Sequence, residues 1–465
     1  MTIFLLATLL LIGGYAVYGL FVEKILGINP KNPTPAQTMA DGVDFVPMKP
    51  GKIFLIQFLN IAGLGPVFGA ILGALYGPVC LFWIVLGSIF AGGVHDMLAG
   101  VISLRNGGST MTAFIQKYFG KAFHALFLIL LVLLLTLVGS IFGQIPARLL
   151  SNMTHIPFEG WLAIIFGYYF LATLLPIDKI IGRFYPIFGA CLIISTILLL
   201  GVLFTKGIDF YPDLHTLNQH PKGKPIFPIM FITIACGALS GFHATQSPMM
   251  ARCLTNEKYS RPIFYGAMIL EGFIALIWAT LGIAFYKGTA GLSAALGESG
   301  NAGAVVSEIS KSFLGNFGGL LAILSVIFLA ITTGDTALRS ARLSLADFLK
   351  ADQKNILKRL IFSAAILGLA TFMAFINLNK IWLYFGWANQ LLACIMLWVG
   401  ALYLHEKGKN EWIAILPALF ITAVCGTYLG YAPILFNLSL NTARILGIII
   451  AAGVLGLYFY RTRKA

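Results

Sequence analysis

Thirteen long apolar segments follow one another along this chain of 465 residues. A helix needs about 20 mostly apolar residues to cross the hydrocarbon core of a bilayer. The segments are residues 2–22, 53–75, 78–104, 121–145, 158–175, 184–205, 226–251, 261–287, 316–346, 356–377, 380–404, 411–431 and 441–460. Because helices satisfy their own backbone hydrogen bonds in lipid, the pattern predicts an all-α polytopic membrane protein with about 13 transmembrane helices.

The composition excludes several other classes of protein. Hydrophobic residues make up 59% of the chain and charged residues only 10%, whereas soluble domains carry about 25% charged residues. A soluble enzyme, a nucleic-acid-binding protein and a disordered protein are therefore excluded. Residues 2–22 have neither a preceding basic residue nor a clear cleavage motif, so we expect a retained helix. The six cysteines lack metal-type spacing and are expected to be small buried apolar side chains.

The distribution of Lys and Arg predicts the orientation in the membrane. Of the 31 such residues, 23 lie after odd-numbered segments or at the C-terminus, and 8 lie on the other side. Because Lys- and Arg-rich loops stay in the cytoplasm, we expect a cytoplasmic C-terminus and an external N-terminus. The net charge of +14 is then an orientation signal rather than a surface for an acidic partner. Two amphipathic pieces, near 107–119 and 301–313, are expected on the membrane surface.

Segments two and seven are interrupted by glycine and polar residues at mid-membrane depth. The interruptions contain Asn60, Gly63, Gly65 and Gly69 in segment two, and Gly237, Ser240, Gly241 and His243 in segment seven. Backbone freed in lipid must be satisfied by protein, water or a ligand. Paired interruptions in two halves of a transporter mark a central site, so we predict that these residues bind substrate. Close packing of small residues is the alternative.

The interval of five segments between the interruptions predicts a 5+5 inverted repeat. The whole of 1–465 is then one transmembrane domain: 1–52 is an N-terminal helix and cytoplasmic loop, 53–205 is the first repeat (helices 2–6), 226–404 is the second (helices 7–11), and 411–465 holds two peripheral helices.

Ionisable side chains within the segments are candidates for ion or proton coupling, because charge inside a membrane is costly and usually functional. They are His95 and Asp96 in segment three, His243 in segment seven, Glu271 in segment eight and Asp335 in segment nine. Asp96 and Asp335 are the leading candidates, although Asp96 can instead anchor broken backbone or pair with Arg105. Adjacent helical residues point about 100° apart, so His95 and Asp96 are not expected to pair. Glu271 has no evident cation nearby and is a secondary proton-carrier candidate.

Oxygen ligands around the first interruption suit Na⁺. The hydroxyls of Thr332 and Thr333 would face backbone carbonyls near Ala62 and Gly65, unless each threonine bonds the carbonyl four residues before it. Freed N–H groups near 65–69 suit a substrate carboxylate.

Other polar residues in the segments leave their partners open. Asn389 and Gln390 are expected either to line the site or to bond the interrupted backbone. His95 and His243 form a metal site only if the fold brings them together.

The motifs in these segments resemble those of the carbon-starvation protein A (CstA) family, over residues from about 10 to about 404. The matching runs are 41–47 (DGVDFVP), 61–66 (IAGLGP), 92–96 (GGVHD), 231–243 (FITIACGALSGFH), 332–339 (TTGDTALR) and 386–390 (GWANQ). The resemblance implies a bacterial inner-membrane carrier for peptides or pyruvate. It also implies the LeuT-like fold of the amino acid–polyamine–organocation superfamily. The superfamily's sodium position maps onto Ala62, Gly65, Thr332 and Thr333.

The chain departs from the family pattern in three respects. Better-known members are much longer. Gln57 and Asn60 stand near the position where many members have two histidines, and His95 stands where many have Gln. These changes leave the substrate and the coupling ion open.

The resulting hypothesis is a secondary active importer of a small carboxylate-bearing nutrient, a short peptide or pyruvate, driven by H⁺ or Na⁺. We expect no cofactor other than Na⁺, and no nucleic-acid partner. No nucleophile elbow, HExxH pair or Walker-type loop occurs in the sequence, so we do not expect an enzyme. A passive channel and a nutrient sensor with a transporter fold are the alternatives.

Overall fold

The structure, a computed structural model, describes residues 1–42, 45–172, 177–211, 217–299, 302–349, 351, 356–376, 378–433 and 435–463, with the backbone alone at 177–186, 188, 298–299, 347, 356 and 378–381. Val43 and Asp44 of the first family-like motif lie outside these ranges. Each of the thirteen predicted segments contains helix in its described part.

The first half of the chain holds ten α-helices. They are α1 (Thr2–Gly13), α2 (Gly19–Leu26), α3 (Pro35–Thr38), α4 (Pro50–Ile61), α5 (Ala70–Gly73), α6 (Val79–Leu86), α7 (Gly93–Arg105), α8 (Met111–Met153), α9 (Phe158–Ala172) and α10 (Ile177–Thr205). The second half continues with α11 (Phe231–Thr233), α12 (His243–Ala251), α13 (Gly266–Phe285), α14 (Thr289–Ser299), α15 (Ala302–Phe348), α16 (Ile356–Met373), α17 (Leu378–Glu406), α18 (Trp412–Tyr431) and α19 (Leu440–Thr462).

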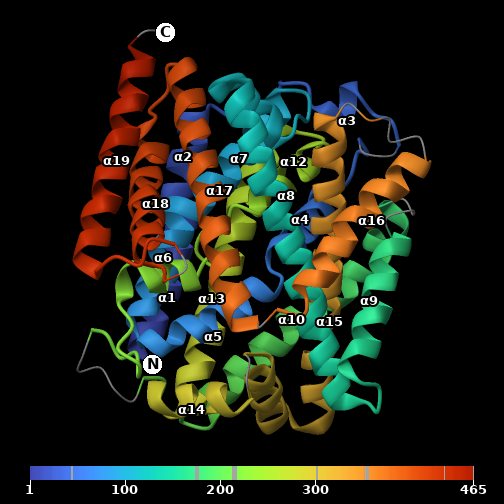
Figure 1. Ribbon diagram of the computed structural model, residues 1–465, viewed down its shortest axis with the longest axis vertical. Helices are drawn as coiled ribbons and strands as arrows, with labels where there is room; N and C mark the ends of the chain where they lie inside the picture. Colours follow the sequence, from blue (N-terminus) through green and yellow to red (C-terminus); the bar gives the residue numbers. More distant parts are fainter. Residues whose placement is uncertain are drawn as a thin grey trace.

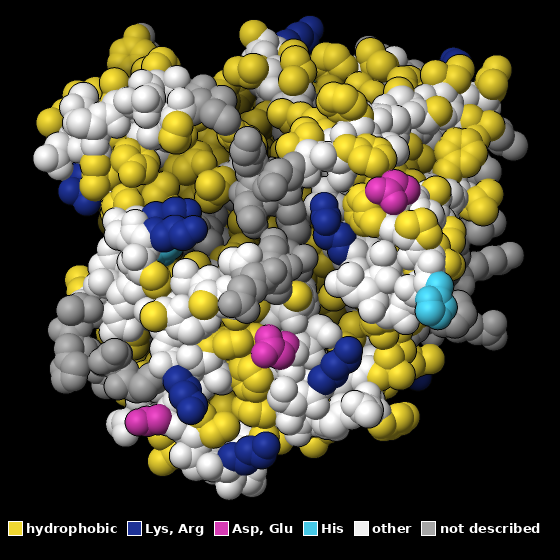
Figure 2. Space-filling model, turned by 60° about the horizontal axis from the view of Figure 1, so that its bottom comes forward, with side chains coloured by type: hydrophobic (Ala, Val, Ile, Leu, Met, Phe, Trp, Pro, Cys, Tyr) yellow, Lys and Arg dark blue, Asp and Glu magenta, His cyan; other side chains and the backbone are white. Residues whose placement is uncertain are grey.

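Eight helical stretches of the described chain are long and apolar enough to span a membrane, and the bent pair Pro50–Ile61 and Gly65–Tyr76 makes a ninth. Among the other predicted spans, α9 is shorter and segment seven is broken into short helices. Large apolar side chains such as Leu9, Val17, Phe372 and Ile448 are 63–73% exposed, as expected for a surface in contact with lipid. Figure 2 shows such hydrophobic areas around an end of the molecule that carries scattered charged side chains.

The helices fall into two packed groups (Figure 1). The bundle consists of α4–α5, α6–α7, α11–α12 and α13, which are predicted spans two, three, seven and eight; α13 packs on α4, α5 and α6, and α12 packs on α7 and α4. The scaffold consists of α8, α9, α15 and α16, which pack on one another. α18 and α19 pack side by side at the edge of the molecule, as expected for peripheral additions.

The two repeats bend at matching places. α8 and α15 each begin with a short helical piece that a single glycine separates from the long helix, Gly120 with φ 81° and Gly315 with φ 67°. Positive φ is readily adopted only by glycine, so these residues let the chain turn from the amphipathic pieces into the spans. The turns fall where the sequence predicts the surface pieces to end.

Helix α17 lies directly against the chain of segment seven. A Cβ atom on Gly241 would overlap the backbone of Asn389 and Ala393, so the close approach requires a residue without a side chain.

We expect Gly241→Ala to lower the melting temperature of the purified protein, because α17 would have to move, at a cost of about 1–3 kcal/mol. The matched control is Gly201→Ala in α10, where an added Cβ meets open space. Differential scanning fluorimetry in detergent compares the two variants, and equal melting temperatures would show that this contact does not constrain the fold.

Candidate functional site

The first interruption separates α4 from the helical turn that resumes at Gly65. The two halves of this span are bent by 49°. Ala62 leaves the helical conformation with ψ 38°. Within the described chain, the N–H of Gly63 has no hydrogen-bond acceptor. The bend therefore leaves a backbone donor free two residues before the stretch 65–69, where the sequence predicts a substrate carboxylate to bind; that binding stays a prediction.

The second interruption lies between α11 and α12, and side chains from α6 and from the helical stretch between α6 and α7 hold part of its backbone. The indole nitrogen of Trp83 donates to the carbonyl of Ile234 at 3.1 Å. The hydroxyl of Ser88 donates to the carbonyl of Gly237, also at 3.1 Å. Gly237 itself has φ +89°. Neither supporting residue is among those predicted from the sequence.

Helix α17 supplies the remaining support for segment seven. The Oδ1 atom of Asn389 accepts hydrogen bonds from the N–H of Phe242 at 2.8 Å and from the hydroxyl of Ser240 at 3.2 Å. The amide nitrogen of Gln390 donates to the carbonyl of Leu239 at 3.3 Å. The sequence leaves two roles open for Asn389 and Gln390. In the structure, both side chains form hydrogen bonds with the interrupted backbone. Direct contact of either residue with substrate stays a prediction.

The two interruptions lie against each other, as the inverted repeat predicts. A Cβ on Gly65 would overlap the side chain of Cys236, and one on Gly237 would lie 3.3 Å from Cα of Pro66. A Cβ on Gly69 would lie 3.3 Å from the carbonyl oxygen of Thr233. The glycines thus allow the two broken backbones to pack closely against each other, as the alternative of small-residue packing also predicts.

Four buried ionisable side chains lie in successive contact beside the second interruption. His95 Nδ1 lies 2.7 Å from Asp96 Oδ1, and His243 Nδ1 lies 2.9 Å from Asp96 Oδ2. His243 Nε2 lies 3.5 Å from Glu271 Oε2. Glu271 Oε1 accepts a hydrogen bond of 3.0 Å from the N–H of Gly237. All four side chains are fully buried. These contacts therefore run from α7 through α12 and α13 to the interrupted backbone.

For these groups one sequence expectation is wrong, one of the alternatives is not realised, and one partner is not foreseen from the sequence. His95 and Asp96 do pair, because both side chains rotate toward each other although their Cα–Cβ bonds diverge on the helix. Asp96 does not pair with Arg105, which binds Glu257 instead. Glu271 does have a neighbouring imidazole, which the fold brings from a different helix. Among the described residues, no group of three or more His, Cys, Asp and Glu side chains has an arrangement suited to a metal ion.

Asp335 is not one of these four contacting side chains. Its Oδ2 atom is 3.8 Å from the Arg339 guanidinium. Thr332 and Thr333 both donate to the carbonyl of Leu329 on their own helix. Thr333 also faces the first interruption, because its hydroxyl would lie 3.0 Å from a Cβ on Gly63. Thr333 thus lies beside the first interruption, while both threonine hydroxyls already donate within α15. A Na⁺ site formed with Ala62, Gly65 and Thr332 stays a prediction.

Solved structures with a similar fold belong to membrane transporters. The crystal structure of MhsT in complex with L-phenylalanine matches with a TM-score of 0.57 and 15% identity, over 88% of this chain and 98% of that one. A manganese transporter from Eremococcus coleocola matches with a TM-score of 0.55 and 15% identity, over 91% and 98%. The LeuT-like 5+5 fold is therefore confirmed.

Sequence relatives cover most of the chain. A protein of Haemophilus influenzae described as a membrane protein is 45% identical over 63% of this chain and 93% of its own length. The Escherichia coli peptide transporter CstA is 24% identical over 90% and 79%, and the pyruvate/proton symporter BtsT of the same organism is 25% identical over 89% and 79%. The family "Carbon starvation protein CstA" matches residues 1–159, 146–289 and 287–427. The chain therefore belongs to the carbon starvation protein CstA family.

Proposed function

We propose that this protein is a proton-coupled importer of a small carboxylate-bearing nutrient, pyruvate or a short peptide. It would lie in the bacterial cytoplasmic membrane with its C-terminus inside. The observation that carries the proposal is the buried contact of Asp96 and Glu271 with His243, beside the interrupted backbone at Gly237. Two relatives, named as a peptide transporter and a pyruvate/proton symporter, support the substrate class and the ion.

Charge burial gives the reason for proton binding. With both carboxyl groups ionised and both imidazoles neutral, His95, Asp96, His243 and Glu271 would carry a net charge of −2 with no exposure to solvent. An unpaired buried charge costs several kcal/mol. Each proton taken up by an imidazole or a carboxyl group lowers that cost, and the two histidines offer positions next to both acids.

The same charges link proton binding to substrate binding. An anionic substrate at the interruptions would be repelled by two unprotonated carboxylates and would be accepted once the side chains are protonated. By thermodynamic reciprocity, the bound anion then raises the affinity for protons, which is the requirement for symport. The free N–H of Gly63 and the turn at 65–69 would hold the substrate carboxylate.

In this proposal, Glu271 couples proton binding to the movement of segment seven. Its carboxylate binds the N–H of Gly237, while α17 holds the other side of the same interruption through Asn389. A change of protonation at Glu271 or His243 would alter how segment seven sits against α17. The expected movement is closure of the bundle against the scaffold around the substrate.

We expect Glu271→Gln to abolish proton-driven accumulation but to retain substrate exchange. The amide oxygen can still accept from the Gly237 N–H, whereas the side chain no longer titrates. Uptake of labelled pyruvate and dipeptides into proteoliposomes with an inward proton gradient measures accumulation, and counterflow measures exchange. The matched control is Glu159→Gln, at an exposed position near the start of α9. Unchanged accumulation by Glu271→Gln would remove this residue from coupling.

Asp335→Asn tests the second carboxylate in the same assay. If Asp335 carries a transported proton, the pH dependence of uptake is lost in this variant. An unaltered pH profile assigns Asp335 a structural role with Arg339, and the proton to the groups around His243.

Coupling to Na⁺ is the alternative that the position of Thr333 favours, and it predicts different behaviour. Under the proton proposal, an inward Na⁺ gradient alone drives no accumulation, and Thr333→Ala changes proton-driven uptake less than about threefold. The contrary result is Na⁺-driven accumulation that Thr333→Ala abolishes, which would place the coupling ion between α15 and the first interruption. Conductance without saturation would favour a channel, and binding without flux would favour a sensor.

A further inference from the structure

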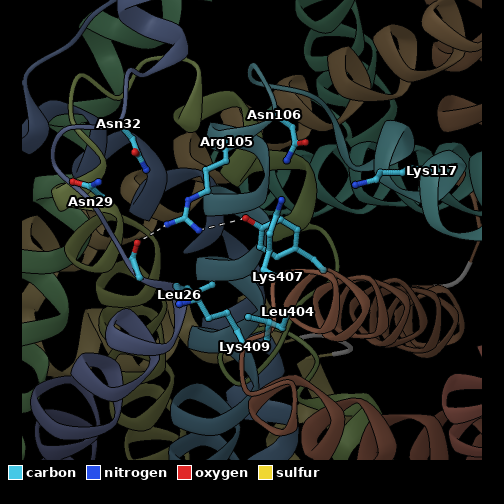
Figure 3. A pocket seen from close by; sticks show the side chains of 11 residues that line it. Leu26, Asn29, Asn32, Arg105, Asn106, Lys117, Leu404, Lys407 and Lys409 are labelled. Carbon is cyan, nitrogen blue, oxygen red and sulfur yellow. Dashed lines mark hydrogen bonds between the residues drawn. The ribbon is translucent and has the colours of Figure 1, made fainter. Parts of the chain in front are cut away.

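A polar cavity of about 400 Å³ lies at the end of the molecule where α2, α7 and α17 terminate (Figure 3). This size is typical of small-molecule sites. Its lining comes from segments far apart in the sequence, and all of them belong to loops that the Lys and Arg distribution assigns to the cytoplasm. The cavity is separate from the interrupted helices, and none of the groups proposed for transport lines it.

Four cationic side chains line the cavity: Arg105, Lys117, Lys407 and Lys409. Two of them have carboxylate partners. The Arg105 guanidinium binds Glu257 at 2.5 Å, and Lys117 lies 2.9 Å from Glu406. Within the described chain, neither Lys407 nor Lys409 forms an ion pair. Neither ammonium group therefore has a carboxylate in direct contact, although Lys407 interacts at longer range with Glu406, whose ion-pair partner is Lys117.

The geometry keeps these charges in position. Arg105 also donates to the carbonyl of Gly27 at 3.0 Å and to the hydroxyl of Tyr403 at 3.4 Å, so it ties α7 to the ends of α2 and α17. Lys407 lies over the Tyr403 ring, with 6.0 Å between its nitrogen and the ring centre. The Lys409 nitrogen lies close to Gly27. The two unpaired ammonium groups thus flank a braced guanidinium.

We propose that this cavity binds a phosphate group, presented either by a free phosphorylated compound or by an anionic lipid headgroup. Two unpaired lysines match the charge of a phosphate dianion, and lysine ammonium groups are common phosphate ligands. The side-chain amides of Asn29 and Asn106 add polar groups to the lining. A bound phosphate would bridge segments of the bundle and α17, the helix that holds the second interruption.

Titration of the purified protein with pyrophosphate tests binding of a free phosphorylated compound. Native mass spectrometry, after purification from mixed phosphatidylglycerol and phosphatidylcholine vesicles, tests binding of an anionic lipid headgroup. The test variant is Lys407→Gln/Lys409→Gln, and both positions are exposed enough to tolerate the change. We expect it to weaken binding at least about tenfold, because two charge-assisted hydrogen bonds to the phosphate are lost.

The matched control is Lys222→Gln/Lys224→Gln, which removes two exposed lysines from the loop expected on the opposite side. Pyrophosphate binding that is lost only in the test variant supports a soluble phosphate ligand. Selective retention of phosphatidylglycerol that is lost only in the test variant supports a lipid headgroup. If wild type binds neither probe, or if both double variants behave alike, the proposal is overturned. These readouts do not depend on transport, so they are independent of the proposed function.

Discussion

The interrupted backbone of segment seven is the feature on which the rest of the site depends. A backbone N–H or C=O without a partner in hydrocarbon costs several kcal/mol, and here several such groups are freed together. Side chains from several helices satisfy them: Trp83 from α6, Ser88 from the helical stretch between α6 and α7, Glu271 from α13, and Asn389 from α17. The break is thus held by specific bonds, and one of the residues that hold it can bind a proton.

Glu271 thus both supports the interrupted backbone and can bind a proton. This double role is the basis of the proposed response of segment seven to protons. A neutral side chain in place of Glu271 could satisfy the Gly237 N–H equally well. A carboxyl group that also contacts His243, itself bound to Asp96, makes the local charge depend on protonation. Because all these groups are excluded from water, their charges act on a nearby anion with little screening. Under the proposed function, proton and substrate then favour each other's binding.

The sequence predicts the architecture well, because its strongest signals are local. The lengths of the apolar segments predict the spans. The glycine-rich runs at 62–69 and 235–241 predict where two helices are interrupted, and the interval between them predicts the inverted repeat. Contacts between helices are not encoded in such patterns. The pairing of His243 with Asp96 and Glu271 depends on how three helices rotate against one another, and the bonds from Asn389 depend on where α17 lies. Even the contact of adjacent His95 and Asp96 was missed, because helix geometry fixes Cβ directions but not side-chain rotamers.

The most direct test of the account is whether protons enter with the substrate. Wild-type proteoliposomes without an imposed gradient are mixed with pyruvate or a dipeptide in weakly buffered, Na⁺-free medium, and the external pH is recorded. The account predicts that addition of a transported substrate makes the medium more alkaline, in step with uptake of labelled substrate. Entry of labelled substrate with no change of external pH, or entry only after Na⁺ is supplied, would contradict it.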